Sequence, residues 1–492
     1  MQLSEAFPLQ FLGANELWSL FPLFALGFGA LFSVIVGTHK TKGHGYAFGV
    51  SFVVLIIALL QASSNLFAPE IKLLGGCLTF DSYTKTVSLM VIFFALIATV
   101  LTYGHDKKEG LLSEVYGLIL FATSGMVLML STSHLIFLFI ALEIMSLAVY
   151  VLVAMRRTSR FSSEAGLKYF ILGGLASAML LYGSSLIFGS TGSFELTAIQ
   201  TFLASHPNPP FIFLIGLGLV SVSMLFKVGA VPFHGWVPDV YQGASTNITG
   251  FMGAAVKFTA FLAFAKIVKH IAMVPGVASL DWFHSVIWLI AAASMIYGNF
   301  VAISQNELKR MLSFSTIAHT GYLLLGLQVM NQSEGGYESL ILYLFFYAIA
   351  NLGAFAIISM FEERNQKDLN FDQIAGLGNK HPVLAILFSI FLLSMAGIPL
   401  TSGFIGKYGL FSMAVNAGQV PLVVIAVLTS VVSVYYYLRV IVYLFMKEST
   451  SSQAIYHRLM GASMAAFLSA AATLQFGLFP RAIISFVKMI AR

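Results

Sequence analysis

The stretch that decides the fold class is residues 211–239, which read FIFLIGLGLVSVSMLFKVGAVPFHGWVPD. Its first sixteen residues contain no charged side chain, and a helix needs about 20 mainly apolar residues to cross a bilayer. Pro232 and Pro238 then interrupt the helix, because proline removes a backbone hydrogen bond and clashes with the preceding turn. Lys227 stands just before this interruption. The stretch therefore predicts a membrane-spanning helix that is broken beside a charged residue.

Composition extends the membrane prediction to the whole chain. The 492 residues are 58% hydrophobic and only 9% charged, whereas a soluble domain usually carries about 25% charged residues. An ordinary soluble enzyme and a disordered chain are both excluded. The single cysteine, Cys77, excludes a disulfide framework, a cysteine-ligated iron–sulfur cluster and a cysteine zinc site. The net charge of +6 is not gathered into a basic cluster beyond Arg156-Arg157, so no nucleic-acid partner is expected.

Fourteen apolar stretches long enough to cross a lipid bilayer follow one another along the chain. They lie near residues 17–37, 46–66, 79–103, 111–131, 134–155, 164–189, 211–239, 247–271, 282–303, 308–330, 337–361, 381–417, 421–446 and 457–480. Because the connections are short, we expect one all-α polytopic transmembrane domain over residues 1–492. Apolar runs such as Val53–Ile57 do not alternate with polar residues, which excludes a β-barrel. The N-terminus lacks a basic region and a small-residue cleavage site, so no signal peptide is expected.

Lysine and arginine in the loops predict the orientation, because cytoplasmic loops carry an excess of both. One alternating set of loops holds fourteen of them: Lys40, Lys42, Lys107, Lys108, Arg156, Arg157, Arg160, Lys309, Arg310, Arg364, Lys367, Lys380, Lys447 and Arg458. The other set, with the termini, holds six: Lys72, Lys85, Lys269, Arg481, Lys488 and Arg492. The first set is expected to face the cytoplasm, and an even number of spans then places both termini outside.

Four charged residues lie deep in the predicted spans: Glu143, Lys227, Lys257 and Lys407. A charge at the bilayer centre costs at least about 2.5–3.5 kcal/mol on insertion scales, so four together rival the net stability of a whole protein. A structural pair, in which Glu143 holds one lysine, would leave two lysines unexplained. The functional alternative is a chain of protonatable groups through the membrane. Lysine suits this role because burial disfavours its charged form and a nearby carboxylate restores it.

Four further polar residues in the spans are less decisive. Lys168, Lys266 and Arg439 lie near span ends, where long side chains can reach the interface. His319 lies in the tenth span and is expected either to relay protons between two of the deep lysines or to be a hydrogen-bonded packing residue. Haem ligation would need paired histidines on facing spans, and most of the eleven histidines lie in loops or at span ends.

A second span is interrupted in the same manner as the first. Residues 396–407 read AGIPLTSGFIGK, which again places a proline, Pro399, near a deep lysine. The two breaks fall in the seventh and twelfth predicted spans. Matching breaks in two parts of a transporter indicate an inverted repeat with an ion path at the breaks. We therefore predict two inverted five-helix units, residues 111–271 and 282–446. The alternative is that proline and glycine are simply common in membrane helices.

Two long motifs resemble those of a known family. The segments FKVGAVPFHGWVPDVYQGA at 226–244 and ELKRMLSFSTIAHTGY at 307–322 are similar to the antiporter-like membrane subunits of respiratory complex I. The variant at Asp239–Gly243 and the run from Gly397 to Lys407 most resemble the N-type subunits. Lys407 argues against the M type, which usually carries glutamate there, and the chain has no room for the lateral helix of the L type. The resemblance covers spans 4–13 and implies fourteen spans with an inverted five-span repeat.

The resemblance also implies roles for the deep residues. Glu143 would be the carboxylate of the fifth span, and Lys227 its partner in the broken seventh span. Lys257 would be the connecting lysine of the eighth span, and Lys407 the terminal lysine of the broken twelfth span. The family translocates protons in the bacterial inner membrane, beside K-type and M-type neighbours. FMN, iron–sulfur clusters and quinone would belong to partner subunits, so no cofactor or metal is expected in this chain.

Three functions are to be distinguished on these observations. The first is a proton-translocating subunit of an NADH:quinone oxidoreductase, driven by its partners, because the chain has no dinucleotide-binding glycine fingerprint and no P-loop of its own. The second is the D-type subunit of an Mrp-type Na⁺/H⁺ antiporter, which has a similar fold and similar motifs. The third is a quinone-binding redox subunit, which no segment of the chain favours. We expect the first, which makes the chain one subunit of a translocating enzyme.

Overall fold

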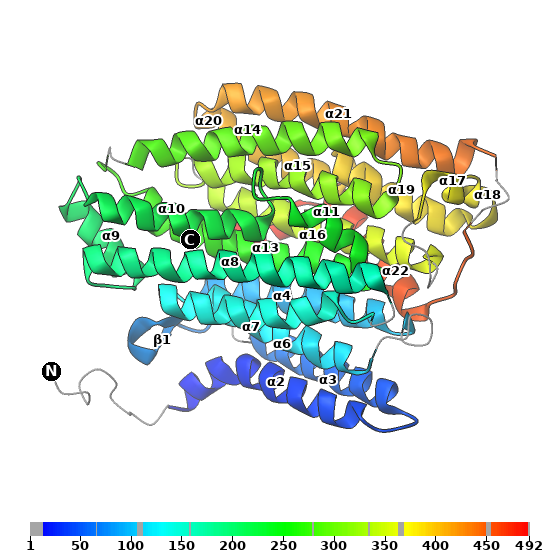
Figure 1. Cartoon of the computed structure of the whole chain (residues 1–492), viewed down its shortest axis with the longest axis horizontal. Coiled ribbons are helices and arrows are strands. Elements are labelled where there is room, and N and C mark those ends of the chain that lie inside the picture. The colour runs from blue at the N-terminus through cyan, green and yellow to red at the C-terminus, as the bar shows by residue number, and fades with distance from the viewer. Residues whose placement is uncertain are drawn as a thin grey trace.

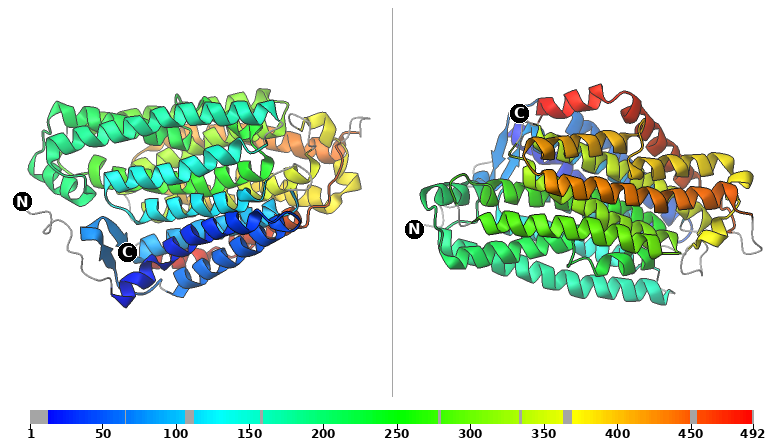
Figure 2. Two further views of the ribbon diagram at one scale, coloured as in Figure 1. Left: turned by 60° about the horizontal axis from the view of Figure 1, so that its bottom comes forward. Right: turned by 90° about the horizontal axis from the view of Figure 1, so that it is seen from above.

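The computed structural model describes residues 13–64, 66–105, 112–156, 159–277, 280–332, 335–362, 369–448 and 454–490. The described chain is mostly helix, and its long helices lie roughly parallel to one another (Figure 1). The blue pair α2 (Ala14–Gly37) and α3 (Gly43–Ser64) forms one edge of the bundle, and the orange α21 (Val420–Met446) lies at the opposite edge. Figure 2 shows the same packing from two further directions. The prediction of an all-α polytopic membrane protein is confirmed.

The centre of the bundle is built from the most completely buried helices. The remaining long helices are α4 (Ser82–Thr102), α6 (Glu114–Ser131), α7 (Leu135–Val153), α8 (Arg160–Thr191), α10 (Phe211–Val228), α14 (Asp281–Ser304), α15 (Leu308–Val329), α16 (Gly336–Phe361) and α22 (Met460–Leu478). The most apolar window of α16 is buried along its whole length. The segment Thr246–Ala272 is nearly as buried. These two segments therefore form the interior of the bundle, and Lys257 lies in the second of them.

The observed spans agree with the predicted number. Twelve helices of the described chain are long and apolar enough to cross a membrane. Helix α15 has 22 residues, which is about 33 Å at helical rise. The helices α19 (Pro382–Ala396) and α20 (Ser402–Asn416) have 15 residues each and follow one another as the two halves of a broken span. With α15 and this pair, the count reaches the fourteen that hydropathy predicted.

Both predicted helix breaks are present and share one local geometry. Gly229 follows α10 with φ +73°, and Gly397 follows α19 with φ +86°. Glycine adopts a positive φ at little cost, whereas a residue with a Cβ does not. In each break the N–H of the residue after the glycine donates back to a carbonyl of the helix that has just ended. The chain resumes as α11 (Trp236–Gly243) in the first break and as α20 in the second. Pro238 lies in the first turn of α11, so the prediction that it also interrupts the helix is wrong, because the first turn of a helix tolerates proline. The inverted arrangement of 111–271 and 282–446 stays a prediction.

Several elements were not expected from hydropathy. A hairpin joins β1 (Ile71–Leu73) to β2 (Leu78–Phe80), with the 3-10 turn η1 (Leu74–Gly76) between them. The hairpin and α9 (Leu196–Ser205) lie at one end of the bundle, and α17 (Phe371–Ile374) and α18 (Leu377–Lys380) lie at the other (Figure 1). A further short helix, α23 (Arg481–Ile490), follows α22. These pieces are too short to be recognised as spans.

The eighth predicted span is not one regular helix. It consists of α12 (Thr246–Phe251), the π-helical turn η2 (Met252–Val256), α13 (Lys257–Ile267) and a second π-helical turn, η3 (Val268–Ala272). Turns of this kind are rare and are frequent at functional sites. The first of them ends directly before Lys257.

The three basic residues near span ends have specific partners. Lys168 pairs with Glu164 at 2.8 Å, as the four-residue spacing allows, and with Asp239 at 2.9 Å. Lys266 donates to carbonyl oxygens at the C-terminal end of α6. Arg439 donates to the backbone carbonyls of Ile303, in the last turn of α14, and of Gln305, which follows that helix. Lys266 and Arg439 therefore satisfy helix ends as fixed donors, a role that hydropathy alone does not distinguish from reaching the interface.

Candidate functional site

The ammonium group of Lys227 is held by hydroxyl groups of α7. Lys227 lies in the last turn of α10 and is only 4% exposed. Its Nζ donates to the Ser146 hydroxyl at 2.9 Å and to the Tyr150 hydroxyl at 3.0 Å. The C-terminal end of α10, where the helix dipole is negative, also favours a cation. Among the described residues Lys227 forms no direct ion pair with Glu143, which acts on it only through space.

Glu143 lies three residues before Ser146 on α7 and is half-buried. One of its carboxylate oxygens, Oε1, is buried and has no hydrogen-bond partner in the described part of the chain. Ile140 and Leu147 on the same helix are 43% and 50% exposed. Glu143 therefore lies at the boundary between the bundle interior and the outer face of α7. Ser146, one turn further along α7, is the residue of this helix that contacts Lys227 together with Tyr150.

Lys257 is positioned by the π-helical turn before it and by α15. Its Nζ donates to the backbone carbonyl of Thr316 at 2.6 Å and lies 5.2 Å from the ring centre of Tyr347. The Thr316 and Tyr347 hydroxyls are 2.8 Å apart. The partners of this ammonium are thus a carbonyl dipole and an aromatic face, with no carboxylate contact among the described residues. Its protonated form is stabilised without being locked to an opposite charge.

His319 is enclosed by tyrosine hydroxyls. It is 2% exposed, its Nδ1 lies 2.6 Å from the Tyr343 hydroxyl, and its Nε2 lies 3.2 Å from the Tyr437 hydroxyl. A hydroxyl can donate or accept, so both tautomers of the ring are compatible with these contacts. Neither ring nitrogen is bonded to a lysine of the described chain. The relay predicted for His319 would therefore have to run through the tyrosines.

Lys407 lies against the end of the helix half that precedes it. Its Nζ donates to the carbonyl of Ala396, the last residue of α19, at 2.9 Å and to the Ser430 hydroxyl at 2.8 Å. It also lies 5.1 Å from the ring centre of Tyr322. A Cβ added to Gly397 would come within 2.8 Å of Lys407 Cδ. The glycine of the break therefore both permits the turn and leaves room for the lysine side chain.

Helix α15 connects these three environments. Thr316, His319 and Tyr322 follow one another at a spacing of three residues, which places them along one face of the helix. Thr316 accepts the hydrogen bond of Lys257, and the ring of Tyr322 lies beside Lys407. On the same helix the Thr320 hydroxyl donates to the Val228 carbonyl at 2.9 Å, at the end of α10. One helix thus contacts the surroundings of all three deep lysines.

The tyrosines and serines of this network were missed by sequence reasoning. Tyr343 and Tyr347 lie one turn apart on α16, and Asn351, one turn further on, donates to the Tyr347 hydroxyl at 3.2 Å. The sequence does contain a signal for this network, because a polar group recurs every four residues along this otherwise apolar helix. It indicates a polar face directed at other helices, because buried tyrosine hydroxyls usually find hydrogen-bond partners.

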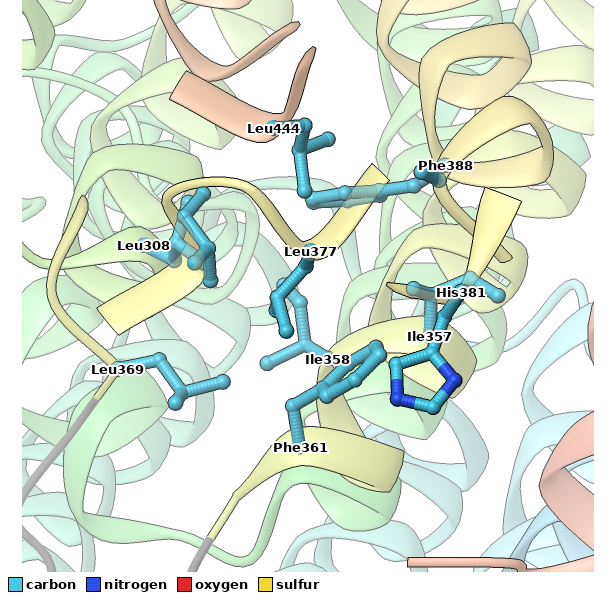
Figure 3. Close-up of a pocket in the computed structure, with 11 residues that line it drawn as sticks. Leu308, Ile357, Ile358, Phe361, Leu369, Leu377, His381, Phe388 and Leu444 are labelled. Atoms are coloured by element: carbon cyan, nitrogen blue, oxygen red, sulfur yellow. The ribbon is translucent and has the colours of Figure 1, made fainter. Parts of the chain in front are cut away.

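Among the cavities of the described chain, one lies away from the deep lysines and another lies beside Lys407. A cavity of about 10 Å³ lies among side chains of α15, α16, α18, α19 and α21, and His381 is the only titratable residue that lines it (Figure 3). It is too small and apolar to contribute to an ion path. A cavity of about 530 Å³ lies beside Lys407. No group of three histidine, cysteine, aspartate or glutamate residues within the described ranges could hold a metal ion.

Comparison with known proteins agrees with this geometry. The family described as NADH:quinone oxidoreductase/Mrp antiporter, TM, matches residues 132–433. The NADH-quinone oxidoreductase subunit N of Trichlorobacter lovleyi is 34% identical over 490 residues, 99% of each chain. The subunit N of Bdellovibrio bacteriovorus is 36% identical over 90% of this chain and 92% of its own.

Solved structures give the same result for the fold. A chain of respiratory complex I from Thermus thermophilus with bound aureothin is 31% identical, with a TM-score of 0.80 over 94% of this chain and 98% of that one. A chain of the Mrp complex from a Dietzia species has a TM-score of 0.84 over 96% and 97%, at 20% identity, which shows a shared fold alone. The chain belongs to the NADH:quinone oxidoreductase/Mrp antiporter membrane family, within the group of NADH-quinone oxidoreductase N subunits.

Proposed function

We propose that this chain translocates protons as the N-type subunit of the membrane arm of an NADH-quinone oxidoreductase. The observation that carries the proposal is the row of buried protonatable side chains, Lys227, Lys257, His319 and Lys407, of which His319 lies on α15 and the three lysines lie in surroundings that α15 contacts. Glu143 begins this row beside α7. We assign it the uptake or release of the proton that Lys227 exchanges.

The energy for this transport comes from partner subunits. Moving one charge against about 200 mV costs about 4.6 kcal/mol, and the chain has neither a nucleotide-binding motif nor a redox-cofactor motif. FMN, iron–sulfur clusters and quinone are assigned to those partners, and K-type and M-type subunits are the expected neighbours. A neighbouring subunit could change the surroundings of the lysines by shifting the packed helices that meet at the two breaks. The chain is placed in the bacterial inner membrane with both termini outside.

The decisive experiment uses the assembled complex with Lys407→Ala. Proton uptake into inverted vesicles and NADH:quinone turnover are measured on the same preparation. Because Lys407 is the last lysine of the row, the variant should lose pumping, and in a tightly coupled complex turnover should also slow. Lys407→Glu should retain part of both, since a buried carboxylic acid can also load and release a proton. Wild-type pumping by the alanine variant would refute the path.

The Mrp-type antiporter is the second candidate, and the shared fold is the observation that favours it. An antiporter subunit would exchange Na⁺ for H⁺ with no contribution from NADH. Native purification separates the two functions. NADH oxidation that copurifies with the chain supports the oxidoreductase, and Na⁺-driven proton exchange without it supports the antiporter.

A further inference from the structure

Two cavities meet along one face of α20. The first, of about 530 Å³, has Lys407 in its lining. The second, of about 700 Å³, is lined by the first turns of α16, by α20 and by α23. Tyr408 and Ser412 belong to both linings. Because they are four residues apart, they lie one above the other on the same side of the helix. The cavities are therefore separated by a layer of side chains that carries two hydroxyl groups.

The second cavity contains a carboxylate. Glu338, in the first turn of α16, is the only acidic residue among those that line either cavity. Lys488 of α23 is the one other charged residue in the lining of the second cavity. The wall between α16 and α20 includes small residues, and a Cβ added to Gly409 would lie 3.6 Å from the Ser339 hydroxyl. The cavity thus combines open space, small polar groups and opposite charges at the end of the bundle that the loop charges predict to face outside.

The cavity beside Lys407 has few polar groups in its lining. Apart from Lys407, Tyr408, Asn416 and a few hydroxyl groups its lining is apolar. Val427 and Val431, on its α21 side, are 45% and 64% exposed at the edge of the bundle, where α21 lies (Figure 1). A charge released toward that edge would enter hydrocarbon, at a high cost. A polar route from Lys407 leads instead across the Tyr408–Ser412 layer, in which Tyr408 is 65% exposed and Ser412 is partly buried.

We propose that Glu338 is the last protonatable side chain of the outward path and receives the proton that Lys407 releases. The inference rests on the proposed function and names the outer end of the same path. An N–H bond of the Lys407 ammonium breaks, the proton passes along the Tyr408 and Ser412 hydroxyls and water in the cavity, and an O–H bond forms on Glu338. Loss of that proton to the outer solution restores the carboxylate. One proton moves in total, no electron is transferred, and Lys488 supplies a positive charge near the carboxylate that remains.

The first test changes the carboxylate in the assembled complex. Glu338→Gln keeps the shape of the side chain and removes its proton exchange, so proton uptake by inverted vesicles should fall by about tenfold. Glu338→Asp should retain most of the uptake, because the carboxylate is kept. Glu70→Gln is the control, since Glu70 is an exposed carboxylate at the same end of the bundle, paired with Lys72. Native gels report assembly for each variant, and wild-type pumping by assembled Glu338→Gln would overturn the proposal.

The second test asks whether the outer solution reaches the Tyr408–Ser412 layer. It measures chemical labelling and so does not depend on pumping. The only native cysteine of the chain, Cys77, is replaced by serine, and Ser412→Cys or Val431→Cys is added. A charged, membrane-impermeant thiol reagent is applied from the outer side, and its attachment is read on this chain by mass. The thiol introduced at position 412 should be modified, whereas the one at position 431, which lines the Lys407 cavity only, should not. Absence of modification at position 412 would contradict the route.

The Lys407→Ala complex separates this inference from the function on which it rests. If Lys407→Ala abolishes pumping while Glu338→Gln does not, the proposed function is supported, but Glu338 is not the outer end of the path. If Lys407→Ala pumps normally, the proposed function itself is wrong, whatever the labelling shows.

Discussion

The Lys227 ammonium lies 2.9 Å from the hydroxyl of Ser146, three residues beyond Glu143 on α7. The lysine of the first helix break is therefore bound by neutral groups, and the carboxylate that sequence reasoning assigned to it acts from a distance. A hydroxyl stabilises the ammonium less than a carboxylate does, because it carries no negative charge to attract the cation. Lys227 is thus held in place without being fixed in one protonation state.

Glu143→Gln should impair pumping severely while the complex still assembles. The substitution removes the negative charge that favours the ammonium form of Lys227, but keeps the volume of the side chain. Proton uptake by inverted vesicles checks this directly. Glu164→Gln is the matched control, because Glu164 is an exposed carboxylate on the neighbouring helix α8 and pairs with Lys168. Equal pumping by the two variants would remove Glu143 from the path.

Lys257→Arg should fail almost as badly as Lys257→Ala. Arginine keeps the positive charge but effectively does not release a proton, so a relay is lost even when the electrostatics are preserved. The same exchange at Lys266 serves as the control on the same helix. Lys266 donates to two carbonyl oxygens, a role that arginine can fill, and Lys266→Arg should keep most of the pumping. Full activity of Lys257→Arg would show that Lys257 acts as a fixed charge.

Gly397→Ala should reduce pumping much more than Gly418→Ala. Both glycines have a positive φ, so alanine costs about 1–2 kcal/mol of backbone strain at either position. Only at Gly397 would the new Cβ meet the Lys407 side chain, at 2.8 Å, whereas nothing lies within 4 Å at Gly418. A shift of about 1 Å in a reacting group can cost about 10²-fold in rate. Pumping rates of the two variants, normalised to assembled complex, decide whether the position of Lys407 matters.

Tyr437→Phe should slow pumping by about tenfold if His319 passes protons through its tyrosine neighbours. The substitution deletes the hydroxyl that lies 3.2 Å from Nε2 and leaves the ring in place. Tyr435→Phe is the control, because Tyr435 lies in the same run of three tyrosines but is 59% exposed. If the two variants pump equally, His319 is a packing residue, which is the alternative that the sequence left open.

Glu362→Gln should destabilise the chain by about 3–5 kcal/mol, because it leaves buried cations without their carboxylate. Glu362 Oε1 lies 3.3 Å from both the Arg156 guanidinium and the Lys309 ammonium, and Lys309 is fully buried. Thermal inactivation of the assembled complex and the yield of assembly report the loss. Glu448→Gln, at an exposed position beyond the end of α21, should change neither. Unchanged heat resistance of Glu362→Gln would show that its other contacts suffice.

The amino-acid sequence by itself determined the membrane class, the number of spans and the places of the two helix breaks. Each of these depends on local composition: apolar length sets a span, and at both breaks a glycine followed closely by a proline marks the end of a helix. The depth of Glu143, Lys227, Lys257 and Lys407 in the membrane also follows from local sequence, by counting residues from the nearest end of each span. The π-helical turn before Lys257 has no such local signature and was not foreseen.

Only the tertiary structure decided which groups the deep residues contact. Ser146 and Lys227 are 81 residues apart in the chain, and His319 and Tyr437 are 118 apart. Nearly every face of a helix at the centre of the bundle is apolar, so hydropathy does not show which face meets which neighbour. The packing of α15 against the helices around it brings the lysines and the tyrosines together, because a buried hydroxyl or ammonium must find a partner on whichever helix lies beside it.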